Sequence, residues 1–233
     1  MEQLSSALTY FVVFLFSTTL HEAAHAWAGL KGGDRTAYEG GQVSLDPLPH
    51  MRREPFGMVI LPLLTSLTMG WPIGYASAPY NINWARAHPR RAAWMALAGP
   101  GANLALALLA ALLLRGGEVA GVIVPPEVAR FGEIATSDAG PLWAAYGRFV
   151  GVLFSMNVLL MAFNLLPFPP LDGSAAITLL MDRRTTARYQ EFIWGTPALS
   201  FLGIFVAWQL FDVVFEPVFF FCLNLVYAGA HYG

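Results

Sequence analysis

Five long apolar blocks divide this chain of 233 residues. They cover residues 4–30, 56–74, 91–114, 143–167 and 197–228. A helix that spans a membrane needs about 20 predominantly apolar residues, and the first, third and fourth blocks meet that length. Continuous apolar blocks indicate helices, because the strands of a membrane barrel alternate apolar and polar residues. The sequence therefore predicts an all-α polytopic membrane protein with a core of three transmembrane helices.

The composition supports this class and excludes several others. Only 12% of the residues are charged and 56% are hydrophobic, whereas soluble domains carry about 25% charged residues. The net charge of -2 gives no sign of nucleic-acid binding. Cys222 is the only cysteine, so an intrachain disulfide is impossible. The amino terminus lacks the basic residues of a cleavable signal peptide.

We expect one membrane-embedded domain over residues 1–233. By the length that a span requires, its core covers about 4–180 and its C-terminal membrane segments about 196–228. The last apolar block is interrupted by Asp212, Glu216 and Pro217. It is long enough for two short spans, or for one span and a helix at the membrane surface.

The distribution of basic residues predicts how the second block lies in the membrane. Lys and Arg favour the cytoplasmic side, and they gather in segments 31–53, 86–91 and 183–188. Segment 116–142 instead holds four acids against Arg130 and is expected outside. These sides agree only if block 56–74, which contains two prolines, enters the membrane and returns without crossing it. The alternative is an ordinary span with a weak charge signal.

The segment "TAYEGGQVSLDP", residues 36–47, has strand-like alternation after a Gly-Gly pair. Alternation of this kind beside turn residues is typical of a short β hairpin. We therefore expect a re-entrant or hairpin-like insertion between the first and third blocks. A plain polar loop is the alternative interpretation of the same residues.

The first apolar block contains "HEAAH", residues 21–25, although ionisable groups are expensive inside a membrane. On a helix, His21 and His25 lie on one face, because residues four apart are neighbours. This is the H-E-x-x-H arrangement, in which two imidazoles bind zinc and the glutamate, here Glu22, acts as general base. The alternative is a helix whose histidines only hydrogen-bond to neighbouring helices.

A catalytic zinc site usually has three protein ligands, so a further ligand is needed. The remaining histidines lie in polar loops or at the terminus, and the acids within or beside apolar blocks are Asp172, Asp212 and Glu216. Asp172 lies in "FNLLPFPPLDGSAA", where prolines interrupt a helix. A broken helix lets an aspartate turn inward at membrane depth. Alternatively, Asp172 is an N-cap of the following helix.

Three motifs, "LHEAAHAWAGLKGGD", "ALAGPGANLALA" and "FNLLPFPPLDG", occur in this order. Together they resemble the site-2 protease family of intramembrane zinc metalloproteases, over about residues 10–180. The chain looks like a compact bacterial-type member without a PDZ or CBS domain. The stretches "GGQVSLDPLPH" and "GWPIGYASAPYNIN" resemble the strand and loop region that such members carry.

The resemblance implies roles for individual residues. It makes His21, His25 and Asp172 the ligands of one Zn²⁺ and Glu22 the general base. Asn164 falls on the family's N-x-x-P…LDG stretch and is expected to orient a substrate strand or stabilise an oxyanion. Asn103, in "GPGAN", is expected to pack or hydrogen-bond near the site, with a simple helix-packing contact as the alternative.

The resemblance also implies the function and the location. We expect hydrolysis of peptide bonds in or near transmembrane helices of membrane protein substrates, as regulated intramembrane proteolysis. The partners are then a substrate helix and the lipid bilayer, with no nucleic acid. The location is a bacterial inner membrane, with the active site toward the cytoplasm. The alternatives are a metal-binding or metal-transport membrane protein, or a proteolytically inactive relative.

Overall fold

The computed structural model describes residues 2–233, with side chains from residue 4. Within these residues the protein is helical and contains no strand. The helices are α1 (Glu2–Gly32), α2 (Thr36–Glu39), α3 (Pro47–Arg53), a π-helical turn (Phe56–Ile60), α4 (Leu61–Met69), α5 (Ile82–Ala87), α6 (Pro89–Val119), α7 (Pro141–Asn164), α8 (Asp172–Ala176), a 3₁₀ turn (Ile177–Leu180), α9 (Arg183–Gly195), α10 (Ala198–Gln209) and α11 (Phe211–Val226).

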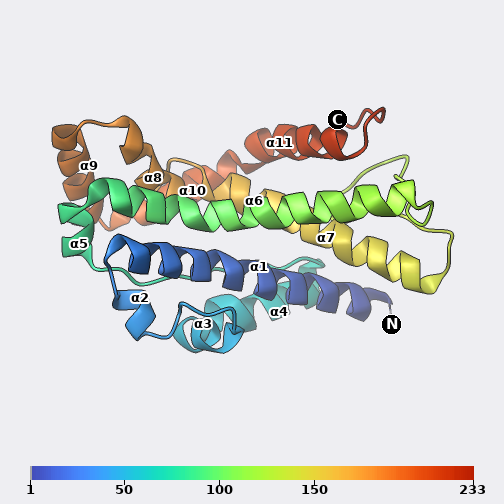
Figure 1. Ribbon diagram of the computed structural model, residues 1–233, viewed down its shortest axis with the longest axis horizontal. Helices are drawn as coiled ribbons and strands as arrows, with labels where there is room; N and C mark the ends of the chain where they lie inside the picture. The colour runs from blue at the N-terminus through green and yellow to red at the C-terminus, as the bar shows by residue number, and fades with distance from the viewer. Residues whose placement is uncertain (1) are drawn as a thin grey trace.

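Three of the described helices are long and apolar enough to cross a membrane, namely α1 from Leu4, α6 and α7. They run along the long axis of the molecule, and α6 packs against both α1 and α7 (Figure 1). They correspond to the first, third and fourth apolar blocks, so the expected three-helix core is confirmed.

The second apolar block forms a short helix that leads away from one end of the bundle. The chain that follows this helix then returns to the same end. Residues Phe56–Met69 are too short to span a membrane, and the helix ends at Gly70, whose φ of +84° is in the left-handed region that glycine adopts readily. The chain then runs back beside α4, where the Tyr75 amide donates to the carbonyl of Gly57 at 3.1 Å. The Asn81 amide donates to Asp34 Oδ2 at 2.8 Å, which returns the chain to the end of α1.

The β hairpin expected in residues 36–47 is not formed, and that prediction was wrong. Asp34 Oδ1 accepts hydrogen bonds from the amide and the hydroxyl of Thr36, and helix α2 begins there. Asp46 then accepts from the Leu48 amide and caps α3. Local bonds from aspartate side chains to the backbone compete with strand pairing. They explain why the alternating pattern does not produce strands.

The last apolar block passes the length of the bundle in two pieces. Helix α9 begins at Arg183 and is capped by Asp182, and hydrogen bonds from Thr185 and from the Arg184 amide lower the pKa of the Asp182 carboxyl. The chain bends by 96° between α9 and α10. Gly203 of α10 packs closely on the carbonyl oxygen of Pro169. Beyond α11, the Tyr227 hydroxyl donates to the carbonyl of Ile134 at 2.8 Å, in the acidic segment at the opposite end of the bundle.

The end of the bundle that carries the acidic segment, opposite α9, is stabilised by a cluster of aromatic side chains, here called the aromatic core. Phe131 of the acidic segment packs against Phe215 and Phe219 of α11, with ring centroids 6.0 and 6.4 Å apart. The Tyr10 hydroxyl of α1 donates to the Phe131 carbonyl at 3.0 Å. Phe154 of α7 completes the contact with Phe219, at 6.4 Å between centroids. This aromatic core joins α1, α7 and α11 at the end of the bundle away from the histidine motif.

Candidate metal centre

Two histidines of α1 and one aspartate of α8 converge inside the bundle. The Nε2 atoms of His21 and His25 are 2.9 Å apart. Asp172 Oδ2 lies 3.1 Å from the first and 3.3 Å from the second. Both histidines are buried, and Asp172 is half-buried. The structure therefore brings together the three residues that the motifs nominated.

Local sequence explains why these side chains meet. His21 and His25 are four residues apart on one helix and share a face. Helix α7 ends at Asn164, and the proline-rich turn folds back so tightly that Gly173 lies against the carbonyl oxygens of Leu165 and Leu166. Asp172 is the first residue of α8 and makes no capping hydrogen bond. The alternative role of Asp172 as a helix N-cap is therefore not supported.

Each imidazole is held at its other nitrogen by an oxygen of α6. His21 Nδ1 lies 2.6 Å from Asn103 Oδ1, and His25 Nδ1 lies 2.7 Å from the carbonyl oxygen of Met95. A nitrogen that faces an acceptor carries the ring proton, so both rings have their Nδ1 protonated. In the neutral imidazole form that binds a metal, both Nε2 atoms then turn their lone pairs toward each other and toward the carboxylate.

This arrangement fits a metal ion. Two lone pairs and a carboxylate oxygen that meet in a buried place repel one another, and burying a charge without a partner is unfavourable. A cation removes both difficulties, and two His and one Asp are a donor set that zinc accepts. Gly99 of α6 supports this assignment, because a Cβ at that position would overlap the Nε2 atoms of both histidines. The helix backbone thus approaches the cluster where a side chain would displace its ligands.

The two predicted catalytic residues are placed differently. Glu22 follows His21 on α1 and is buried. Within residues 2–233, no side-chain hydrogen bond or ion pair engages its carboxylate. Asn164 is the last residue of α7, and its Nδ2 donates to the carbonyl of Leu160 at 2.9 Å. No hydrogen bond among the described residues joins Asn164 to the metal-binding cluster.

Asn103 hydrogen-bonds to His21 beside the cluster, as one of its two interpretations predicted. Ser17, Asn157 and the Met95 carbonyl were not found from the sequence. The Asn103 amide nitrogen donates to Asn157 Oδ1 at 2.8 Å, and the Asn157 amide donates to Ser17 Oγ at 2.9 Å. Asn157 interrupts the apolar residues of α7, and a polar residue inside a membrane segment indicates an interhelical hydrogen bond. That signal was available in the sequence, but it does not say which helix supplies the partner. The Met95 carbonyl is a backbone group, so its role depends on no side-chain signal at all.

The remaining candidate ligands do not form a second cluster. The acids Asp212 and Glu216 lie on exposed faces of α11. His50 is buried in α3, where its Nε2 lies 3.0 Å from the carbonyl oxygen of Ser44. In the part of the chain that the structure describes, His21, His25 and Asp172 are the only group of three such residues that could hold a metal. A line of ligands through the membrane, as a transporter would need, is not seen among these residues.

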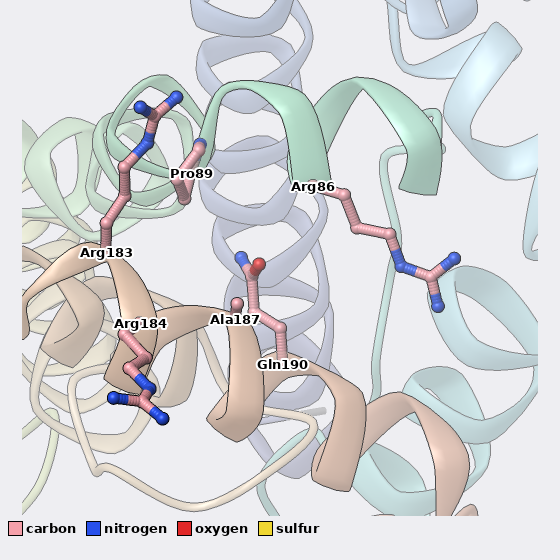
Figure 2. A pocket seen from close by; sticks show the side chains of 6 residues that line it. All are labelled: Arg86, Pro89, Arg183, Arg184, Ala187 and Gln190. Atoms are coloured by element: carbon pink, nitrogen blue, oxygen red, sulfur yellow. The ribbon is translucent and has the colours of Figure 1, made fainter.

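A separate cavity of about 360 Å³ lies between α9 and the corner where α5 meets α6. Its lining residues are Arg86, Pro89, Arg183, Arg184, Ala187 and Gln190. None of them belongs to the metal-binding cluster. Figure 2 shows the three guanidinium groups pointing in different directions, so they do not converge on one ligand. Arg86 instead lies over the ring of Trp194, 5.4 Å from its centroid, and ties α5 to α9.

The fold and the cluster define a class, a helical membrane protein with two histidines and one aspartate that could hold a metal ion. Residues 9–204 match the model of peptidase family M50. Because this match covers most of the chain, the protein belongs to peptidase family M50. It is a zinc metalloprotease of the site-2 protease type, and the resemblance identified from the three motifs is confirmed.

Curated relatives agree with this assignment. The chain is 28% identical over 231 residues to a Bacillus subtilis (strain 168) protein named "Putative zinc metalloprotease YwhC", covering 91% of this chain and 95% of that protein. It is 29% identical over 209 residues to "Putative zinc metalloprotease Rip2" of Mycolicibacterium smegmatis, covering 85% and 71%. It is 33% identical over 167 residues to the Mycobacterium tuberculosis protein of the same name, covering 70% and 54%. No solved structure matches the chain significantly.

Proposed function

We propose that this protein is an intramembrane endopeptidase, which hydrolyses peptide bonds in or near the transmembrane helices of membrane protein substrates. The observation that carries the proposal is the convergence of His21, His25 and Asp172 within a bundle of membrane-length helices. Polar ligands at such depth are expensive unless they serve a function. The glutamate of the H-E-x-x-H motif, Glu22, adjoins these ligands.

In this proposal His21, His25 and Asp172 hold the zinc ion and Glu22 is the general base. When bound, zinc polarises the substrate carbonyl and acidifies water. The Glu22 carboxylate, which no other described side chain engages, accepts the proton of the attacking water. It then delivers that proton to the leaving amine, as a general base that becomes a general acid.

Asn164 is proposed to contact the substrate. It ends α7 at the turn that leads to Asp172, and its amide now bonds within its own helix. Rotation of that side chain would release the N–H that now donates to Leu160, so that both N–H groups of the amide are available. They would then be free to hold an extended substrate strand or the developing oxyanion. A substrate helix has to unwind locally first, because its own hydrogen bonds occupy its amides.

We propose that residues 1–233 form one membrane-embedded protease domain in a bacterial inner membrane. In this arrangement α1, α6 and α7 span the membrane, and residues 56–74 enter and return. Helices α10 and α11 together form one further crossing. Most basic residues lie at the end of the bundle that carries the metal-binding cluster, which favours a cytoplasmic active site. The substrate would be a membrane protein cleaved by regulated intramembrane proteolysis.

The test is cleavage of a transmembrane peptide by the purified protein in lipid vesicles, together with its zinc content. Glu22→Gln should lower the cleavage rate by about 10²–10⁴-fold, the usual contribution of a general base, while zinc remains bound. Glu216→Gln is the matched control, because Glu216 is exposed on α11. It should keep both cleavage and zinc.

The metal ligands are tested by the same two measurements. His21→Ala and Asp172→Ala should each lose zinc and cleavage, because a three-ligand site does not tolerate the loss of one ligand. Full zinc content in Asp172→Ala would place the third ligand elsewhere. If the Glu22→Gln variant cleaved the peptide at the wild-type rate, the catalytic role of Glu22 would be disproved.

A further inference from the structure

The two histidines of the metal-binding cluster are oriented by different kinds of partner. His25 faces a backbone carbonyl, that of Met95, which can only accept a hydrogen bond. His21 faces the side-chain amide of Asn103. An amide has an oxygen on one side and a nitrogen on the other. The protonation of His21 therefore depends on which way the Asn103 amide is turned.

A chain of buried hydrogen bonds decides that orientation. The Asn103 Nδ2 donates to Asn157 Oδ1 at 2.8 Å and lies 3.5 Å from the carbonyl oxygen of Ser17. The Asn157 Nδ2 donates to the carbonyl of Leu153 at 2.8 Å and to Ser17 Oγ at 2.9 Å. Ser17, Asn103 and Asn157 are all 0% exposed. This chain of hydrogen bonds is therefore shut off from bulk solvent.

The chain has a fixed direction, because it ends on a backbone carbonyl. The carbonyl of Leu153 only accepts, so the nitrogen of Asn157 must face it and the oxygen of Asn157 must face Asn103. Asn103 must then offer its nitrogen to Asn157 and its oxygen to His21. His21 consequently keeps its proton on Nδ1 and presents the lone pair of Nε2 to the cluster.

We propose that Asn157 is a positioning residue for the metal centre. Supported by Ser17, it acts through Asn103 to fix the tautomer and the ring orientation of His21. Hydrogen bonds to the distal nitrogen of a ligating histidine typically change metal affinity by about 10–100-fold. This inference rests on the proposed role of His21 as a metal ligand. It assigns α7 a part in the metal centre besides the turn that carries Asp172.

The test compares one substitution in two backgrounds. Asn157→Leu removes the polar group with little change of volume. It should lower zinc affinity, measured by competition with a chelating dye, by about 10–100-fold. In Asn103→Asp both side-chain oxygens accept, so His21 Nδ1 is bonded whichever way that group is turned. Adding Asn157→Leu to Asn103→Asp should then not lower zinc affinity by more than about 3-fold, because the carboxylate still accepts from His21 Nδ1 and no longer faces the oxygen of Asn157.

A purely structural role predicts a different result. If Asn157 only packs α7 against its neighbours, its substitution lowers zinc affinity by the same factor in both backgrounds. An equal loss in the two backgrounds, or no loss in the single variant, overturns the inference. Asn224→Leu is the matched control, because among the described residues the Asn224 side chain of α11 hydrogen-bonds only to Tyr232. It should leave zinc affinity unchanged.

A measurement on the unsubstituted protein keeps the inference testable if a variant does not fold. In the zinc-free protein labelled with ¹⁵N-histidine, the neutral His21 ring should carry its proton on Nδ1. A proton on Nε2 overturns the inference. His21→Ala separates the two levels of the argument. If this variant keeps its zinc, the proposed site itself fails. If it loses zinc while Asn157→Leu keeps full affinity, only the positioning role fails.

Discussion

The two ends of the bundle are stabilised in different ways. The end with the acidic segment is held mainly by ring packing among Phe131, Phe154 and Phe219, which requires shape but little direction, with hydrogen bonds from the hydroxyls of Tyr10 and Tyr227 beside it. From the middle of the bundle toward the other end, Ser17, Asn103 and Asn157 are buried beside two histidines, and their contacts are directed hydrogen bonds. Packing drives helix association in membranes, whereas a buried polar chain is tolerated where it orients a functional group. We therefore expect stability and zinc binding to respond to substitutions at different ends.

The largest effect is expected at Gly99. Gly99→Ala places a Cβ against the Nε2 atoms of His21 and His25, so the two rings cannot keep their positions. Zinc affinity should fall by more than about 100-fold, beyond the usual effect of an indirect contact. Gly101→Ala is the control on the same helix, because nothing lies within 4 Å of its Cβ position. Equal zinc affinity in the two variants would show that the backbone approach at Gly99 is not needed.

A substitution in the aromatic core should have the reverse effect of Gly99→Ala, because it should lower stability and leave zinc affinity nearly unchanged. Phe219 is 3% exposed, and Phe219→Ala leaves a cavity among the rings of Phe131, Phe154 and Phe215. Such a truncation destabilises by about 3–5 kcal/mol, seen as a lower thermal midpoint of the protein in detergent. The zinc affinity of the folded fraction should stay within about 3-fold, since the cluster is not touched. Phe221→Ala is the control, because Phe221 is 65% exposed.

A strong fall of zinc affinity in Phe219→Ala would contradict the expectation that stability and zinc binding respond to substitutions in different parts of the bundle. It would mean that the two ends form one cooperative unit, whose metal centre depends on packing at the opposite end.

The smallest effect is expected at Asp34, which lies at the same end as the metal centre but belongs to the scaffold. Asp34→Asn turns an amide donor toward the Asn81 amide or toward Thr36, so one hydrogen bond of the return segment is lost. The expected loss is about 1–3 kcal/mol of stability, with faster proteolysis of residues 70–81. Asp46→Asn should be neutral, because asparagine caps helices as well as aspartate does.

This end of the bundle has two roles, the scaffold role of Asp34 and the binding of metal by the cluster. Zinc content distinguishes them. If Asp34→Asn lowers zinc content as strongly as Gly99→Ala, the whole end of the bundle is one functional unit. Unchanged zinc content would confine the function to the buried polar chain and the cluster.

The sequence predicted those parts of the protein whose signals are local. Helical spacing placed His21 and His25 on one face, and the break before Asp172 showed where a third ligand would turn inward. The alternation in residues 36–47 misled, because Asp34 and Asp46 bond to nearby backbone and hold short helices there. The role of Asn157 could not be predicted. It depends on how α7 is rotated against α6, and this rotation results from packing along the whole length of both helices.

The way in which α6 holds the two histidines limits how a substrate reaches the centre. Both rings belong to α1, yet each is fastened at Nδ1 to an oxygen of α6, one from Asn103 and one from Met95. A helix that inserted between α1 and α6 would break both of these hydrogen bonds at once. The Nε2 lone pairs of the two histidines would then turn away from a bound metal. The contact between α1 and α6 should therefore stay closed if these residues hold a metal, and a substrate helix of the proposed protease would have to enter elsewhere on the bundle.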